Sequence, residues 1–240
     1  MDESNKVVFV NNLNQILESG GADLYGFADI KSIEPTLRYN LPVAISFAKA
    51  IDPGLVASIP SGASKAYIKE VDSVSAHLDK IGDKLTNYLQ SNGFQAIKFQ
   101  STYEEETDEI LSTPFPHKTV AVLAGLGWIG KCALVINQKF GSAIRINKVL
   151  TDAPLPCALP DLKVKCGKCM KCVDICPGDA LTGKNWSLDS PQESYYDVHA
   201  CYKAAAERCE KATGLRDAYC GLCISACPWT VKYLEKALSK

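Results

Sequence analysis

Cysteine is the residue type whose number and spacing stand out in this chain. Eleven cysteines occur in 240 residues, and all except Cys132 lie at or after residue 157. Seven of them form two blocks, Cys166-x2-Cys169-x2-Cys172-x3-Cys176-Pro177 and Cys220-x2-Cys223-x3-Cys227-Pro228. Cytosolic chains rarely use cysteine for disulfides, so a cluster this dense indicates metal ligation.

The first block has the spacing of a bacterial ferredoxin [4Fe–4S] site, in which three thiolates of one tight loop each reach a different iron. The fourth thiolate, followed by proline, ligates the other cluster. One predicted ligand set is therefore Cys166, Cys169, Cys172 and Cys227. The other predicted set contains Cys176, Cys220 and Cys223. Two clusters need eight thiolates, and the blocks supply seven. The residues alone leave the eighth open between Cys157, Cys201 and Cys209.

Structural zinc is the alternative occupant of such a cysteine pattern. Zinc sites use four ligands in two pairs, whereas this chain repeats a run of cysteines that ends in Cys-Pro, so the pattern favours iron–sulfur clusters. Such clusters accept and donate single electrons at low potential, which predicts electron transfer. An electron path needs an acceptor, and the N-terminal part of the chain is the place for it.

A glycine-rich stretch, Gly125-Leu126-Gly127-Trp128-Ile129-Gly130-Lys131, is the second motif. It contains G-x-G-x-x-G, which in a dinucleotide site follows a strand, opens a helix and has an acid about 20 residues on. Asp152 stands near that offset, but in a proline-rich turn. A glycine turn that lets backbones pack closely is the simpler interpretation. Backbone lying against a large flat cofactor is a third.

The first 155 residues have the patterns of an α/β domain that could position these motifs. Apolar periodicity predicts helices before Gly20 and over residues 71–88, the second with His77 on its solvated flank. Strands are predicted at 24–28, 42–48, 95–100 and 143–150, and a loop at 52–64. Residues 119–124 fit either a helix or a strand, and residues 231–238 a terminal helix. The acidic run 104–109 is expected to be a solvated loop.

Composition sets the domain organisation and the compartment. The sequence changes at 151–156 from α/β patterning to a loop-rich, cysteine-rich part, so we predict two domains, 1–155 and 156–240. The net charge of −1 argues against a general polyanion binder. No apolar run approaches the ~20 residues of a membrane span, and the N-terminus lacks a signal-peptide pattern. We therefore expect a cytoplasmic protein without a membrane partner.

The glycine stretch, Phe140-Gly141-Ser142, Val149-Leu150-Thr151-Asp152-Ala153-Pro154-Leu155 and the cysteine blocks ending in Cys227-Pro228-Trp229 together resemble the epoxyqueuosine reductase family. That family is related to the corrinoid-dependent reductive dehalogenases. The resemblance is collinear over nearly the whole chain. It implies a nitroreductase-like α+β domain that holds base-off cobalamin, with a two-cluster ferredoxin-like domain packed on it.

The resemblance also implies roles for individual residues. Cys201 would be the eighth cluster ligand, because His199-Ala200-Cys201-Tyr202 occupies the isolated cysteine position of the family. The corrin or its nucleotide tail would lie against Gly125, Gly127, Trp128, Gly130, Lys131 and Ser142. The clusters would reduce Co(II) to Co(I), either for a bound substrate or for a corrinoid protein. A redox partner protein would supply the electrons.

Two departures from the family bear on the substrate. In the reductases an Asp about fourteen residues before the glycine turn donates a proton, whereas residues 111–117 of this chain contain no acid. His117 is the candidate that could donate a proton in its place. The chain also ends about ten residues after Trp229, without the extension that helps the larger reductases to hold tRNA. We therefore expect tRNA not to be the substrate, although an epoxyqueuosine reductase acting on tRNA stays an alternative that the resemblance implies.

Two functions remain as alternatives to a corrinoid oxidoreductase. A two-cluster electron carrier would have the same cysteines and no cofactor in the α/β part. A flavin- or nicotinamide-linked reductase would feed the clusters from a different cofactor. Corrinoid binding would distinguish the corrinoid oxidoreductase from the electron carrier and from the flavin- or nicotinamide-linked reductase.

Overall fold

The computed structural model describes residues 2–101 and 116–239. The predictions for the acidic run 104–109 and for residues 111–115 lie outside these ranges. Within them the elements follow in the order α1 (Glu3–Ser19), β1 (Leu24–Asp29), β2 (Val43–Ala50), α2 (Pro53–Ser58), η1 (Ile59–Ser61), α3 (Lys65–Ser91), β3 (Ala96–Lys98), α4 (His117–Leu123), β4 (Trp128–Ile129), β5 (Val135–Ile136), β6 (Ile144–Thr151), α5 (Lys171–Asp174), η2 (Gln192–Ser194), α6 (Val198–Thr213), α7 (Leu222–Ser225) and α8 (Pro228–Leu238).

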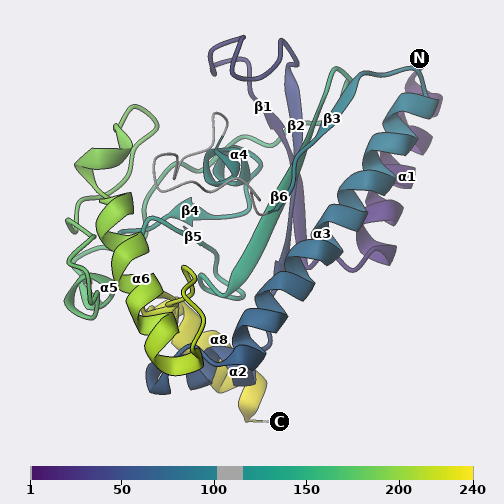
Figure 1. The fold of residues 1–240 in the computed structure, drawn as a ribbon. Helices are drawn as coiled ribbons and strands as arrows, with labels where there is room; N and C mark the ends of the chain where they lie inside the picture. Colours follow the sequence, from purple (N-terminus) through teal and green to yellow (C-terminus); the bar gives the residue numbers. More distant parts are fainter. Residues whose placement is uncertain (1, 102–115, 240) are drawn as a thin grey trace.

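An antiparallel sheet in the order β1-β2-β6-β3 forms the centre of the α/β part. β2 is buried over Val43–Ala48, as its unbroken apolar sequence predicts for a central strand. Helices α1 and α3 lie side by side on one face of this sheet, and α4 with the β4–β5 hairpin lies on the other (Figure 1). The mixed α/β fold expected from the sequence is confirmed.

Two apolar layers stabilise the two faces of the sheet. On one face, Leu13 of α1 and Leu78 and Leu85 of α3 are fully buried against Phe47 of β2. Each such side chain stabilises the fold by roughly 1.5–3 kcal/mol relative to an exposed one. The other layer joins α4 and the hairpin to residues of the cysteine-rich part, including Cys172 and Cys227.

In the helical regions, one prediction was wrong, one open alternative is decided and one helix was missed. The segment predicted as a loop at 52–64 contains α2 and η1, because Asp52 accepts the N–H of Leu55 and Pro53 occupies the first helical turn, where proline is favoured. In the ambiguous segment 119–124, residues 119–123 belong to the helix α4, and Ala124 is its C-cap residue. The helix α6 was not predicted, although Asp197 caps its start and Gly214 ends it in the left-handed conformation.

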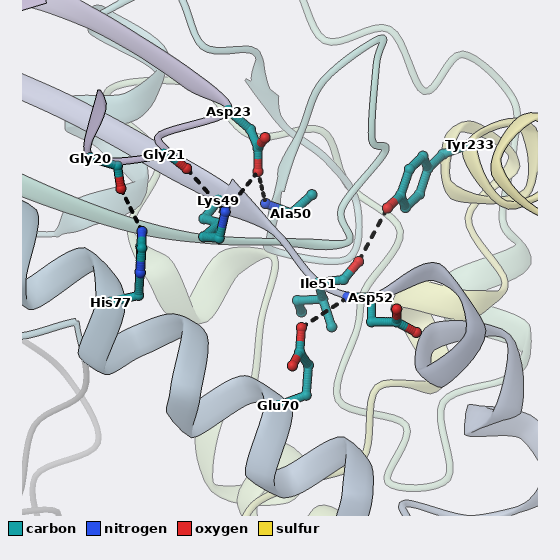
Figure 2. A network of polar contacts seen from close by, with 10 residues as sticks. All are labelled: Gly20, Gly21, Asp23, Lys49, Ala50, Ile51, Asp52, Glu70, His77 and Tyr233. Atoms are coloured by element: carbon teal, nitrogen blue, oxygen red, sulfur yellow. Dashed lines mark hydrogen bonds and ion pairs between the residues drawn. The ribbon is translucent and has the colours of Figure 1, made fainter. Parts of the chain in front are cut away.

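A network of polar contacts fixes the ends of β1 and β2 (Figure 2). The Asp23 carboxylate accepts the N–H of Ala50 at 2.8 Å, and its oxygen lies 3.9 Å from the Lys49 ammonium. Lys49 also donates to the carbonyl of Gly21 at 3.0 Å. These bonds hold the turn between α1 and β1 against the end of the neighbouring strand.

The same network reaches α3 and the C-terminal helix. Nε2 of His77 lies 2.6 Å from the carbonyl oxygen of Gly20, so the expectation that His77 is solvated is wrong. Tyr233 donates its hydroxyl to the carbonyl of Ile51 at 3.2 Å (Figure 2). This last bond ties α8, which begins directly after Cys227, to the end of β2.

Buried apolar contacts cross the predicted boundary at residue 155. Trp128 of β4 and Trp229 of α8 pack edge to face, with ring centroids 5.3 Å apart. A further cluster joins Val56 of α2 and Val71 of α3 to Leu222 of α7. The division into 1–155 and 156–240 therefore stays a prediction about two parts that share buried surface.

Candidate iron–sulfur and cofactor site

Two cavities collect the cysteines of the two blocks. The small cavity, with a volume of about 250 Å³, is lined by Cys166, Cys169, Cys172 and Cys227. The large cavity, of about 400 Å³, is lined by Cys176, Cys201, Cys220 and Cys223. These are the two ligand sets predicted from the spacing and the family resemblance, so the fold brings each set together around its own space.

The local structure explains how each block turns its thiols inward. Gly167 adopts φ 54° between Cys166 and Cys169, and Gly221 adopts φ 75° between Cys220 and Cys223. Backbone with positive φ is accessible to glycine without steric cost, so both loops can turn tightly at these points. One helical turn follows each loop, α5 after the first and α7 after the second, and the two turns pack together.

The proline after the last cysteine of each block directs the chain away from its loop. Pro228 occupies the first turn of α8, with Cys227 as its N-cap residue, so Cys227 reaches the small cavity from a separate helix. Cys176 likewise leaves the first loop and lines the large cavity. The exchange of the fourth ligand between the blocks agrees with the ferredoxin pattern.

The three candidates for an eighth thiol occupy different surroundings. Cys201 lines the large cavity from the first turn of α6. Cys209 is fully buried, its sulfur 3.6 Å from the hydroxyl of Thr213, and it lies roughly 12 Å further along the helix axis, at 1.5 Å per residue. Cys157 packs against the α1–α3 layer and contacts the carbonyl of Leu155.

Burial and mutual proximity act on the thiols of the large cavity. Burial raises the pKa of Cys223, and the nearby sulfurs of Cys201 and Cys220 raise it further. Burial likewise raises the pKa of Cys201. Thiols crowded in this way lose their protons when a metal binds, because the metal supplies the compensating positive charge.

The lining of the cavities bears on the two metal interpretations. The small cavity, of about 250 Å³, is larger than the roughly 30 Å³ that a water molecule occupies in the liquid, and it is lined by Lys131, Lys165 and Trp229 as well as by thiols. In the described ranges, no three Cys, His, Asp or Glu side chains converge on a point that could hold one metal ion. Each cavity gathers the thiols of one predicted set, as a polynuclear cluster in which each sulfur binds its own iron requires.

A cysteine outside the two ligand sets lines both cavities. Cys132 follows the glycine stretch, is almost wholly buried, and borders the small and the large cavity at once. A hydrogen bond between its thiol and Cys172 raises the pKa of Cys132. The position of Cys132 between the cavities was not predicted, and the sequence carries no signal for it beyond its residue type.

The large cavity extends beyond its thiols to the α/β part. Tyr67 and Val71 of α3, His117 and Lys118 of α4, and residues 144–146 of β6 form its other walls. Among the described residues, the charged side chains that line it are basic: Lys118 and Arg145, beside the neutral His117. The Lys118 ammonium donates to the carbonyl of Ala133 at 2.9 Å. Arg145 donates to Ser75 at 3.1 Å and to the carbonyl of Ser101 at 3.2 Å.

The electrostatic surroundings of His117 bear on its predicted role. Burial holds the pKa of the His117 imidazole well below its usual range, and the charges of Lys148 and Arg145 lower it further. The ring is therefore neutral at neutral pH. A general acid works best when its pKa lies near the working pH, so the prediction that His117 donates a proton receives no support from this geometry.

The residues predicted to hold a corrinoid are divided between several places. Ser142 lines the large cavity, and its N–H donates to the Thr230 hydroxyl at 3.1 Å. Lys131 lines the small cavity, with its ammonium 3.5 Å from the sulfur of Met170. Of the others in the described chain, Gly125, Gly127, Trp128 and Gly130 line neither cavity.

The glycine stretch is a close-packed turn. The helix α4 precedes the stretch, and the strand β4 lies within it. The dinucleotide interpretation, which needs a strand before the motif and a helix after it, is therefore wrong. A Cβ atom on Gly127 would lie 2.0 Å from the carbonyl oxygen of Ile136. On Gly130 it would lie 2.2 Å from the Ile136 side chain and 3.3 Å from the Cys166 sulfur. These glycines let the hairpin close against the small cavity.

Comparison with known proteins agrees with the cysteine chemistry. Residues 165–230 match a family described as a 4Fe-4S double cluster binding domain. The chain is 30% identical over 196 residues to an epoxyqueuosine reductase of Salmonella typhimurium, a match that covers 81% of this chain and 47% of that protein. It is 27% identical over 226 residues to a tetrachloroethene reductive dehalogenase of Desulfitobacterium hafniense, covering 91% of this chain and 38% of that protein. The chain thus spans half or less of the length of these relatives.

Solved structures share the fold. A reductive dehalogenase described in connection with B12-dependent dehalogenation superimposes with a TM-score of 0.71 at 18% identity, covering 94% of this chain and 33% of that one. An epoxyqueuosine reductase bound to a modified tRNA-Tyr stem loop gives a TM-score of 0.64 at 15% identity, covering 94% and 66%. In the described part of the chain, no helix combines the length and the apolar character that crossing a membrane requires.

Proposed function

We propose that this chain, which is related to the epoxyqueuosine reductases and the reductive dehalogenases, is an iron–sulfur oxidoreductase with two [4Fe–4S] clusters and a corrinoid. The observation that carries the proposal is that each of the two predicted sets of four cysteines lines its own cavity, with Cys132 bordering both. The larger of the two cavities opens directly onto the walls of the α/β part. An acceptor held against those walls would lie next to the second ligand set.

The proposed ligands of the first cluster are Cys166, Cys169, Cys172 and Cys227. Those of the second are Cys176, Cys201, Cys220 and Cys223. The linings of the small and the large cavity support both sets, and the remote surroundings of Cys209 and Cys157 support Cys201 as the eighth thiol.

The large cavity is the proposed place of the corrinoid. When bound, the clusters supply single electrons and the corrinoid supplies a cobalt centre that can accept them. Ser142, Ile144 and Ile146 would contact the cofactor from the α/β side. The cavity of about 400 Å³ would also hold the second cluster, so most of a complete cobalamin would lie outside it.

Basic side chains and a tyrosine hydroxyl line the walls of this cavity. Lys118 and Arg145 place positive charge on its walls, where the deprotonated thiols of a cluster need compensation. Tyr67 lines the same wall, and burial raises its pKa to about 12. Its hydroxyl is therefore protonated at neutral pH and could donate a hydrogen bond to a substrate in the cavity.

An anaerobic titration of the cluster-loaded protein with cob(II)alamin, followed by electron paramagnetic resonance, tests the proposal. We expect a base-off cobalt signal that saturates at one equivalent. Ala204→Phe, which fills the large cavity from α6, should abolish the signal, whereas Lys203→Phe on the exposed side of the same helix should not. Iron content is measured in parallel, so that loss of the second cluster is recognised.

Failure of the wild-type protein to bind cobalamin would contradict the corrinoid part of the proposal. With iron at about eight per chain, that result would leave a two-cluster electron carrier. Binding of flavin or nicotinamide in its place would indicate the third function considered from the sequence.

Action on tRNA is a second candidate, favoured by the relationship to epoxyqueuosine reductases. A related fold binds a modified tRNA stem loop. The test is single-turnover reduction of epoxyqueuosine in such a stem loop by the cluster- and cobalamin-loaded protein. Conversion to queuosine would establish this activity, and its absence with an active control enzyme would exclude it.

A further inference from the structure

A lysine immediately precedes each cysteine of the loop that contributes three thiols to the small cavity. The sequence reads Val164-Lys165-Cys166-Gly167-Lys168-Cys169-Met170-Lys171-Cys172. All three lysines are exposed. A fourth exposed lysine, Lys232, comes from α8 and lines the same cavity together with Lys165. We call Lys165, Lys168, Lys171 and Lys232 the lysine rim.

Local contacts hold parts of the lysine rim beside the thiols. The Lys165 ammonium lies 3.1 Å from the Asp161 carboxylate and 5.5 Å from the centre of the Trp128 ring. The Lys232 ammonium lies 5.1 Å from the centre of the Trp229 ring. Because the two tryptophans pack against each other, the rim is anchored on the same apolar contact that joins α8 to the hairpin.

The second ligand set has no such rim. The residues that directly precede its cysteines are Ile175, Ala200, Tyr219 and Leu222. The large cavity receives its positive charge from Lys118 and Arg145, which line its inner walls. With a net charge of −1 for the chain, the lysine rim is a local excess, placed at one of the two cluster sites only.

We propose that the lysine rim is the docking surface for an acidic one-electron carrier protein. This inference rests on the proposed function, because it requires a cluster between the thiols of the small cavity. The reduced carrier would lose one electron, and the cluster beside the rim would gain it, with no proton or group transferred. Electrons would then enter at the first ligand set, and the second would face the acceptor.

The position of the charges favours a protein carrier over RNA. Electron transfer needs close approach to the cluster. Lys165 and Lys232 line the cavity of the thiols, and the other two lysines of the rim are next to Cys169 and Cys172 in the chain. Complementary charge around a docking site accelerates association by about 10- to 1,000-fold at low salt, and salt weakens the effect. A basic surface that bound RNA would have no reason to be centred on a redox site.

Charge reversal of the rim tests the docking surface. The test variant is Lys165→Glu/Lys168→Glu/Lys171→Glu, and the matched control reverses three exposed lysines of α3, Lys69→Glu/Lys80→Glu/Lys84→Glu. The probe is a small acidic ferredoxin. Stopped-flow absorbance follows electron transfer from its reduced form, and calorimetry measures binding of its oxidised form to the oxidised, cluster-loaded protein.

At low salt we expect electron transfer to the rim variant to be at least about tenfold slower than to wild type, and ferredoxin binding to weaken similarly. The wild-type rate should fall steeply as salt is added, whereas the rim variant should show little salt dependence. The control should stay within about twofold of wild type.

The outcomes separate this inference from the proposed function. Iron well below eight per chain in the wild type, or clusters that photoreduced deazaflavin cannot reduce, would contradict the proposed function. Intact, reducible clusters with equal ferredoxin rates in the rim variant and wild type would overturn the docking surface alone. Tighter binding of unmodified tRNA than of ferredoxin, lost in the rim variant, would likewise overturn it in favour of an RNA surface.

Discussion

At the residue scale, the eighth cluster ligand is the sharpest question, because Cys201 and Cys209 lie on one helix. Cys201 lines the large cavity, whereas Cys209 is buried beside Thr213. We expect Cys201→Ser to retain about four irons per chain, since one cluster would lack a ligand. Cys209→Ser should keep about eight irons per chain. The iron content of the anaerobically purified variants decides between the two cysteines. Equal iron in both variants would contradict the assignment.

Cys132 provides a second test at this scale, since it borders both cavities without belonging to either proposed ligand set. If the sets are complete, Cys132→Ala should keep about eight irons per chain. Loss of the hydrogen bond to Cys172 should change the environment of the first cluster only. Iron analysis with electron paramagnetic resonance of the reduced clusters measures both effects. A loss of four irons would make Cys132 a ligand in place of one of the eight.

Lys148 gives a prediction about pH and stability. Burial in the centre of β6 lowers the pKa of the Lys148 ammonium from 10.5 to about 7, with the Phe99 ring centre 4.2 Å away. The unfolded chain then binds more protons than the folded one between about pH 7 and 10.5, so this residue's contribution to stability rises with pH across that range. Below pH 7 the buried amine is charged in the folded protein as well, and the full free-energy cost of burying this charge lowers the stability. At pH 7 this cost is at most on the order of 4 kcal/mol.

Lys148→Met removes this cost while keeping an unbranched side chain. The melting temperature of the variant relative to that of the wild type should therefore fall as the pH rises from 7 to 10, because only the wild type gains stability as its amine loses the charge. Anaerobic thermal unfolding of the cluster-loaded proteins at both pH values measures it. A difference that grows with pH would show that the folded protein stabilises the charged amine.

At the scale of elements, a helix with strongly periodic large apolar residues could be predicted, whereas helices that bury small residues or are very short were missed. The long helix α3 repeats large apolar side chains every three or four residues, which predicted a helix over residues 71–88; the helix itself begins earlier and ends later, at Lys65–Ser91. In α6 the buried positions are Ala205, Ala206 and Cys209, which give a weak apolar pattern. The helix α2 is short and rich in loop-forming residues, and its capping aspartate and proline are the signals that would have identified it.

Contact between the loop before β6 and α8 links the fold to the first ligand set. Gly141 adopts φ 61°, and a Cβ atom there would lie 2.2 Å from the backbone nitrogen of Thr230. Gly141→Ala should therefore displace the first turn of α8 and with it Cys227. We expect cluster content to fall to about four irons per chain and the melting temperature to fall.

Gly93→Ala is the matched control for this change. Gly93 also has a positive φ, 83°, but nothing within 4 Å of the added Cβ atom. It should lose only the roughly 1–2 kcal/mol of a left-handed non-glycine residue and keep its iron. If both variants kept eight irons, the contact between Gly141 and Thr230 would not be needed to position Cys227.

At the scale of the whole molecule, the thiol pattern could be predicted and the cavity could not. Cluster spacing is local, because each block holds its ligands within a dozen residues. The large cavity is built from residues as far apart as Tyr67, Arg145 and Cys223, which only the folded chain brings together. The same reason explains the corrinoid predictions: motif residues such as Gly127 and Trp128 support the hairpin, whereas Ser142 lines the large cavity.

The two apolar layers should respond differently when the clusters are removed. The layer that includes α4 and the β4–β5 hairpin contains Cys172 and Cys227, so losing iron removes links within it. The layer of α1 and the C-terminal half of α3 contains no proposed ligand. Hydrogen exchange after anaerobic chelation should accelerate over residues 128–136, 166–176 and 220–230.

The hydrogen-exchange rates of backbone amides in α1 and in residues 81–91 should stay within a few-fold of those in the cluster-loaded protein. The burial of these helices against the sheet does not depend on the thiols. Uniform acceleration across the chain would mean that the shared contacts, Trp128 against Trp229 above all, couple both layers into one cooperative unit. The clusters would then hold the whole fold together as well as carry its electrons, and the predicted boundary at residue 155 would not separate independently stable domains.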